Sequence, residues 1–133
     1  MFNLFKPTRS KRNYRRPVRK GSVKPQTIKM IQNDMRNVDV LLQGKSPSQL
    51  RQALITTDKA LDNALRDLVS GETMGERLKN AYTLFDKTLY NQIWSAHKMR
   101  NALVHESGYE PPHHMVTGGI NNLKKGLRSL GAL

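Results

Sequence analysis

Apolar residues along most of this chain recur at spacings of three and four, the pattern of a helix face packed against a core. The pattern occupies five segments, at about residues 26–43, 47–70, 74–85, 88–108 and 113–130. No window alternates apolar and polar residues with a period of two over the length of a strand. The sequence therefore predicts an all-α protein.

Residues that typically begin or end helices separate these segments. Gly44 closes the first helix, and Ser46 followed by Pro47 supplies an N-cap and a first-turn proline for the second. Gly71 ends the second helix, and Thr88 is the candidate N-cap of the fourth.

A proline pair at 111–112 breaks the chain before the last segment. Helices joined by such short connections pack against their neighbours in antiparallel order. We therefore expect an antiparallel bundle of four main helices plus one short helix, preceded by an extended basic tail.

Basic residues are concentrated at the N-terminus. The chain has 23 Lys and Arg and 10 Asp and Glu, for a net charge of +13 on 133 residues. Residues 1–30 hold ten of the basic residues and no acid, whereas the other 103 residues have a net charge of only +3. We therefore divide the chain into a basic, extended, RNA-binding tail at 1–25 and a helical bundle at 26–133.

A block of like charges repels itself, buries little surface and becomes ordered on a polyanion. Phe2, Phe5 and Tyr14 lie among the cations, and their rings can stack on unpaired bases. The same charge also suits DNA, an acidic membrane surface or a tail that only keeps the protein in solution. We favour RNA, bound by Lys6, Arg9, Lys11, Arg12, Tyr14, Arg15, Arg16, Arg19, Lys20 and Lys24.

One position of the fourth apolar stripe carries a charge. The stripe runs through Leu89, Ile93, Ala96, Arg100 and Leu103. An arginine keeps its charge and is costly to bury without a partner. The side chain must either pair with an acid inside the bundle or open into a functional cleft.

Two further polar residues follow on the same helix. Asn101 and His105 are four residues apart and share a face, and His97 lies one turn earlier. We expect His97 to border the same groove or to pack beside Trp94.

The stretch Arg100-Asn101-Ala102-Leu103-Val104-His105 fits the R-x4-6-H motif, with a polar residue after the arginine, of the higher eukaryotes and prokaryotes nucleotide-binding (HEPN) family. The segments T-D-K-A-L-D at 57–62, G-E-T-M-G-E-R-L-K at 71–79 and W-S-A-H-K-M-R-N at 94–101 are similar to those of small bacterial HEPN-like proteins. The resemblance covers about residues 26–133 and leaves out the basic tail.

The resemblance implies a helical bundle with the motif near the end of a long, late helix. The family includes ribonucleases and also inactive RNA-binding or scaffold members. In active members two protomers join their motifs in a homodimer cleft and cut RNA without metal, with the 2′-hydroxyl as nucleophile. Here His105 would be the general acid or base, Arg100 would neutralise the phosphorane, and Asn101 would orient the histidine or the phosphate.

The same residues also have a purely structural interpretation. Asp58 and Asp62 lie beside the stripe of the second helix, so either can form an ion pair with Arg100 that fixes the packing. His105, near a helix C-terminus, can interact with the last carbonyls and the helix dipole.

Other classes of function are less compatible with the sequence. There is no cysteine for thiolate metal sites, and the four histidines lack an H-E-x-x-H pattern, so we expect no metal and no cofactor. No run of 18 apolar residues predicts a membrane span. We expect a cytoplasmic, ribosome-associated protein.

Three functions remain in order of preference. The first is an RNA-binding protein whose tail threads into ribosomal RNA while the bundle docks on the RNA, with ribosomal proteins as further partners. The second is a metal-independent, toxin-like HEPN endoribonuclease, which requires a homodimer. The third is a DNA-binding or membrane-peripheral protein that uses the same charge.

Overall fold

The computed structural model describes residues 21–133, in which the regular structure is helical and no strand occurs. Four long helices and one short helix confirm the predicted bundle. They are α1 (Pro25–Gly44), α2 (Pro47–Leu68), the short α3 (Met74–Asn80), α4 (Lys87–His105) and α5 (His113–Ser129). A single 3-10 turn, η2 (Tyr82–Leu84), lies between α3 and α4.

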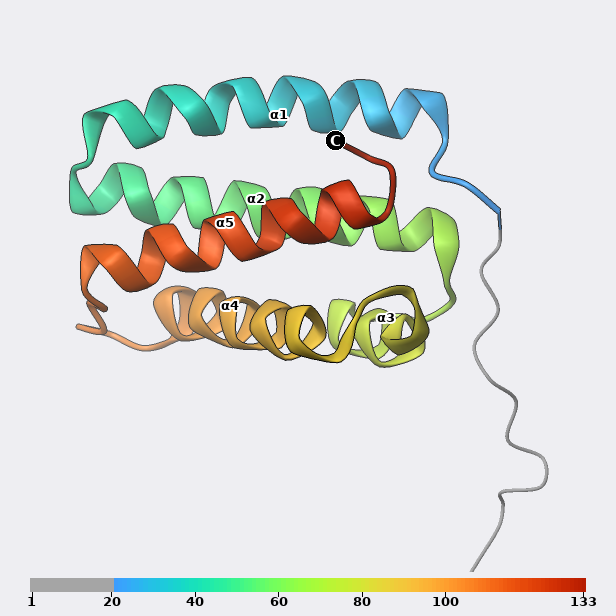
Figure 1. Cartoon of the computed structure of the whole chain (residues 1–133). Helices are drawn as coiled ribbons and strands as arrows, with labels where there is room; N and C mark the ends of the chain where they lie inside the picture. Colours follow the sequence, from blue (N-terminus) through green and yellow to red (C-terminus); the bar gives the residue numbers. More distant parts are fainter. Residues whose placement is uncertain (1–20) are drawn as a thin grey trace, which may run out of the picture.

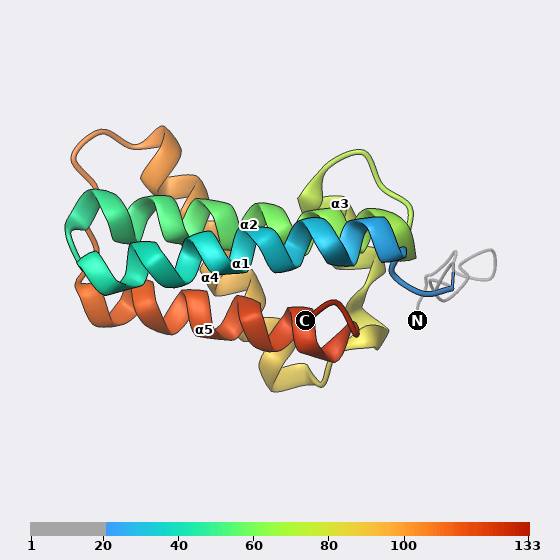
Figure 2. The same ribbon diagram turned by 90° about the horizontal axis from the view of Figure 1, so that it is seen from above.

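The long helices are stacked with α1 and α4 on opposite sides of the bundle (Figure 1). Helix α1 packs along α2, α2 also packs against α5 and α4, and α5 packs against α4. Seen from above, α2 and α5 run side by side beneath α1 (Figure 2). Helix α2 is therefore the central element, and ten of its residues are buried.

Small residues let the helices that carry the candidate site approach closely. A Cβ atom added at Gly126 of α5 would lie 2.9 Å from Cδ1 of Ile93 on α4. A Cβ at Gly119 of α5 would lie at an ordinary contact distance of 3.5 Å from the Cβ of Ala96. Ile120, Leu123 and Leu127 are buried on α5, and Leu130, which follows the helix, is buried as well.

The connection between α1 and α2 follows the predicted capping with one difference. The Ser46 hydroxyl accepts from the Gln49 backbone N–H at 3.2 Å, and the Gln49 side chain accepts from the Ser46 N–H at 3.3 Å, which completes a capping box. Gly44 remains helical, and the left-handed residue is Lys45 with φ of 58°. A Cβ at Gly44 would overlap the end of the Gln49 side chain, which would then have to leave its place in the capping box.

Two predicted boundaries in the middle of the chain are wrong. The third helix ends at Asn80, since Ala81 departs from helical geometry with φ of −99° and ψ of 9° and a 3-10 turn follows. Phe85 is buried but extended, with φ of −130° and ψ of 151°, so it is not part of the helix. The N-cap of α4 is Asp86, whose carboxylate accepts from the Leu89 N–H at 2.9 Å, and Thr88 lies within the first turn. A carboxylate at this position also interacts favourably with the helix dipole.

The beginning and the end of the described chain are packed against the bundle. Val23 is buried, and the Lys24 backbone N–H donates to Asp67 at 3.0 Å, just before α1 begins at Pro25. Ala132 is buried as the C-terminus turns back toward α1 (Figure 1). Within residues 21–133 no helix has the length and apolar character needed to cross a membrane.

We predict that Gly71→Ala lowers the free energy of unfolding by about 1–3 kcal/mol, measured by chemical denaturation. Gly71 has φ of +143°, and a Cβ there would lie 2.9 Å from the Arg77 backbone nitrogen. The control is Gly118→Ala in α5, where a Cβ would meet nothing within 4 Å. This variant should gain roughly 0.5–1 kcal/mol from helix propensity. Equal losses in the two variants would contradict the role of Gly71.

Candidate functional site

A buried carboxylate joins α2 to the helix that carries the motif. Asp58 of α2 is 2% exposed, and His97 of α4 is 7% exposed. Nδ1 of His97 lies 3.0 and 3.2 Å from the two carboxylate oxygens of Asp58. A buried carboxylate requires such partners, because an unpaired charge in the interior is very costly.

The hydrogen bonds continue from His97 to Asn101 and Arg100. Nε2 of His97 lies 3.4 Å from Nδ2 of Asn101, and Nη1 of Arg100 donates to Oδ1 of Asn101 at 3.0 Å. An amide nitrogen only donates, so Nε2 accepts and the proton of the histidine is on Nδ1, facing Asp58. Arg100, Asn101, His97 and Asp58 thus form one directed chain, which we call the Asp58 network.

Arg100 also forms an internal ion pair with Asp58, which is one of the two alternatives that its place in the stripe leaves open. Its Nε lies 3.7 Å from Oδ2 of Asp58, too far for a hydrogen bond, and is buried with no hydrogen-bond partner in the described part of the chain. The side chain is 31% exposed, so the outer part of the guanidinium reaches solvent. Arg100 therefore closes the Asp58 network at the bundle surface.

His105 is placed apart from the other two motif residues. It is the last residue of α4 and is exposed, and its side chain forms no hydrogen bond or ion pair with any residue from 21 to 133. The structure brings Arg100 and Asn101 into contact and leaves His105 outside the Asp58 network.

Asp62, the other predicted partner of Arg100, binds different arginines. Its carboxylate accepts from Nε and Nη2 of Arg77 at 2.7 and 3.0 Å, and it pairs with Arg66 at 3.4 Å. Arg77 is 6% exposed and also donates to the Gly71 carbonyl at 2.7 Å, so it fastens α3 and the loop before it to α2. A two-point contact of this kind is a geometry that arginine favours.

Two buried polar residues were missed by the sequence reasoning. Arg77 received no role, and His97 was expected only at a groove edge or beside Trp94. The ring of His97 does pack edge-on against Trp94, with centroids 6.0 Å apart, but its main partner is Asp58. The available signal was the spacing of Asp58 and Asp62, one helical turn apart on a largely apolar face, because each needs a cation or donor opposite.

Most predicted RNA-binding residues lie outside the described residues. Those outside are Lys6, Arg9, Lys11, Arg12, Tyr14, Arg15, Arg16, Arg19 and Lys20. Lys24 is described and is exposed at the start of α1, next to the tail.

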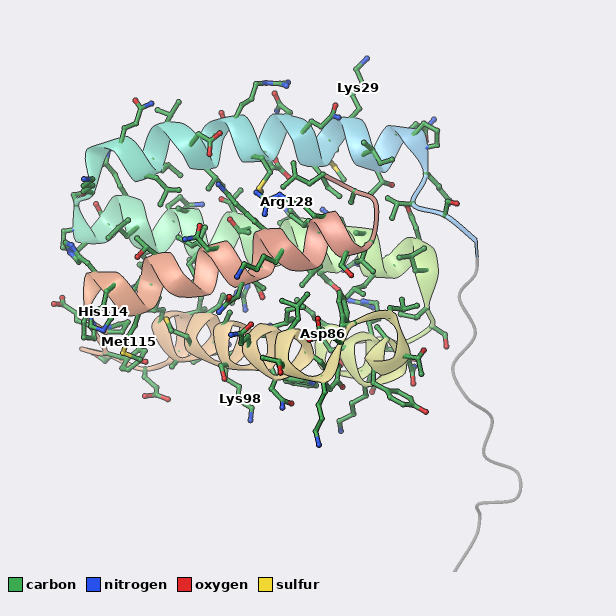
Figure 3. All side chains as sticks on the ribbon, viewed as in Figure 1. Lys29, Asp86, Lys98, His114, Met115 and Arg128 are labelled. Atoms are coloured by element: carbon green, nitrogen blue, oxygen red, sulfur yellow. The ribbon has the colours of Figure 1, made fainter. Side chains whose placement is uncertain are left out.

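The carboxylates of the bundle are largely engaged by the protein itself. Asp58 and Asp62 serve the arginines and His97, while Asp39 pairs with Lys124 at 3.1 Å. Others bind backbone N–H groups, namely Asp67 with Lys24, Glu76 with Glu72 and Asp86 with Leu89. Cations such as Lys29 on α1 and Lys98 on α4 project from opposite sides of the bundle (Figure 3).

Comparison with protein-family models, curated proteins and solved structures finds no match to this chain.

We predict that Arg100→Met leaves the protein folded, with a free energy of unfolding within about 1 kcal/mol of the wild type. Methionine preserves packing along the stripe, and Asp58 keeps its hydrogen bond from His97. Arg100→Ala should lose roughly 1–2 kcal/mol because the aliphatic stem is also removed.

Thermal and urea unfolding followed by circular dichroism measure both variants. Arg66→Met, at an arginine whose side chain is 61% exposed, is the control and should change stability by less than about 0.5 kcal/mol. If Arg100→Ala were as harmless as this control, Arg100 would have no part in the packing.

Proposed function

We propose that the protein binds RNA, with ribosomal RNA as its target, through the basic tail at 1–25 while the bundle docks on the same RNA. The observation that carries this proposal is the separation of charge. Residues 1–30 hold ten Lys and Arg and no acid, and the bundle engages most of its carboxylates internally. Cations that neutralise phosphates release counterions, which is the main source of affinity for nucleic acid.

RNA is favoured over a membrane surface by the composition of the tail. Prolines at 7, 17 and 25 oppose a continuous amphipathic helix, which is the usual form of a surface-bound membrane segment. Phe2, Phe5 and Tyr14 provide rings that can stack on unpaired bases. Stacking combined with phosphate neutralisation is typical of single-stranded and structured RNA.

The HEPN-like ribonuclease is ranked second because of the Asp58 network. A catalytic arginine must be available to the phosphorane, whereas Arg100 is engaged by Asp58 and Asn101. His105, by contrast, is exposed and unpaired within residues 21–133, as an acid or base in an open cleft would be. Because His105 is exposed in this way, the ribonuclease remains the second candidate function.

The first test of the proposal removes the charge of the tail. Changing the eight Lys and Arg of residues 1–20 to Gln should weaken RNA binding by orders of magnitude. The slope of log affinity against log salt should also flatten by about 0.7 for each phosphate that the tail no longer neutralises. Fluorescence anisotropy of a labelled rRNA fragment at several salt concentrations measures both quantities.

A second variant, deletion of residues 2–20, leaves Val23 and Lys24 in place because both are tied to the bundle. A control changes three exposed bundle cations, Lys29, Lys59 and Lys98, to Gln and should alter the slope much less for each cation removed. Unchanged affinity and slope after either change to the tail would disprove the proposal.

The ranking of binder over nuclease is tested separately. We expect the purified wild-type protein to leave single-stranded RNA intact in the presence of a chelator, and His105→Ala to change stability by about 1 kcal/mol or less. An acid-base histidine contributes roughly 10²- to 10⁴-fold to a rate, so a nuclease would lose its activity with this change. Chelator-resistant cleavage that leaves 2′,3′-cyclic phosphates and disappears in Arg100→Ala and His105→Ala would reverse the ranking.

A further inference from the structure

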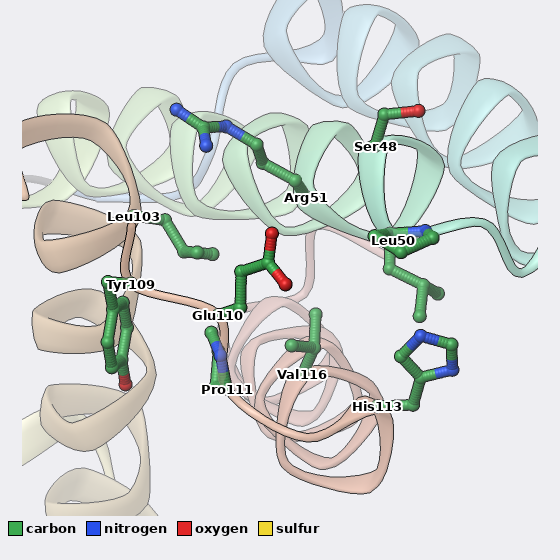
Figure 4. Close-up of a pocket in the computed structure, with 10 residues that line it drawn as sticks. Ser48, Leu50, Arg51, Leu103, Tyr109, Glu110, Pro111, His113 and Val116 are labelled. Carbon is green, nitrogen blue, oxygen red and sulfur yellow. The ribbon is translucent and has the colours of Figure 1, made fainter. Parts of the chain in front are cut away.

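A cavity of about 330 Å³ opens between the start of α2, the loop that joins α4 to α5, and the start of α5. Its floor is formed by Leu50, Leu103 and Val116, which are all buried (Figure 4). The volume is at the lower end of the range for pockets that bind small molecules, which also combine apolar walls with a few polar groups.

Besides Ser48, four polar side chains surround this floor: Arg51, Tyr109, Glu110 and His113. They come from α2, from the loop and from α5, and Figure 4 shows Glu110 rising from the loop toward α2. None of the four side chains forms a hydrogen bond or an ion pair with another residue of the described range. The rim therefore presents a cation and a carboxylate that are unpaired within residues 21–133, beside the ring of Tyr109, which is partly buried against the core.

Glycine and proline residues restrict the conformation of the loop between α4 and α5, which carries Tyr109 and Glu110. Gly108 has φ of +77°, which glycine adopts readily, and Pro111 and Pro112 each fix their own φ. Helix α5 then begins with no side-chain cap and no acid in its first turn. Its free N–H groups give this side of the cavity a partial positive charge.

We propose that the cavity receives one unpaired base of an RNA strand, guanine in preference to the others, with the adjoining phosphate at Arg51. This inference rests on the RNA-binding function proposed above. The apolar floor accommodates a flat base, and Tyr109 offers a ring for stacking. The Glu110 carboxylate accepts two hydrogen bonds side by side, which suits the N1–H and the amino group of guanine.

The mixed charge of the rim argues for this ligand over a simple anion. A carboxylate at the mouth repels a ligand that is negative throughout, so the ligand must present donors toward Glu110 and its charge toward Arg51. A guanine nucleotide has both, whereas adenine, cytosine and uracil lack two adjacent donors on the pairing edge. An apolar peptide would leave both charges without a partner.

The test compares trinucleotides that differ only in the central base. Labelled UGU, UAU and UCU carry the same phosphates, so contributions from the tail cancel in the ratio of their affinities for the full-length chain. We expect UGU to bind at least about fivefold more tightly than UAU, the lower end of what a two-point contact to a base edge provides. Fluorescence anisotropy at one salt concentration gives the ratio.

Two variants test whether the cavity causes the preference for guanine. Glu110→Gln should bring the UGU-to-UAU ratio close to one, whereas Glu106→Gln, at an exposed carboxylate that does not line the cavity, should leave the ratio unchanged. Tyr109→Leu should weaken all three trinucleotides by about fivefold or more because stacking does not depend on the base. Thermal melts verify that each variant is folded.

Equal binding of UGU and UAU by the wild type, or equal effects of Glu110→Gln and Glu106→Gln, would overturn the cavity assignment. If the longer rRNA fragment still binds with a steep salt slope in that case, the RNA-binding function itself stands. If neither the trinucleotides nor the fragment bind, both proposals fail.

Discussion

The buried carboxylate of Asp58 is the constraint on which the arrangement of the long helices depends. It lies in an otherwise apolar interface, so it must be supplied with donors, and only one register of α4 on α2 brings His97 and Arg100 to it. One turn further along α2, the carboxylate of Asp62 also requires donors, and Arg77 of α3 supplies them. This pair fixes the position of α3 on α2. Polar pairs of this kind contribute more to the choice of one packing than to stability.

The Asp58 network also decides how the motif of α4 is to be interpreted. Arg100 and Asn101 are used in holding the bundle together, and only His105 is left exposed beyond them. Asp58 and Asp62 are paired with cations of the bundle, and residues 31–133 have a net charge of only +3. The concentrated positive charge of the sequence is therefore in residues 1–30.

The described chain begins at one end of the bundle, and the start of α2 and the loop between α4 and α5, which line the cavity, lie at the other end (Figure 1). The 20 residues of α1 separate the two ends, which corresponds to about 30 Å at the rise of an α-helix. Salt-dependent affinity and base preference would arise at separate places, so they can be measured independently.

The sequence by itself determined the helices, since a period near 3.6 residues, the Ser46-Pro47 start and the apolar stripes are local properties. It also offered an internal acid as one of two interpretations of Arg100, with Asp58 and Asp62 as candidate partners and a functional cleft as the other interpretation. Tertiary structure decided for Asp58, because Arg100 and Asp58 meet only when α4 packs on α2. The cavity likewise forms only where α2, α5 and the loop between α4 and α5 pack together. Local sequence patterns do not predict which of these distant segments lie side by side.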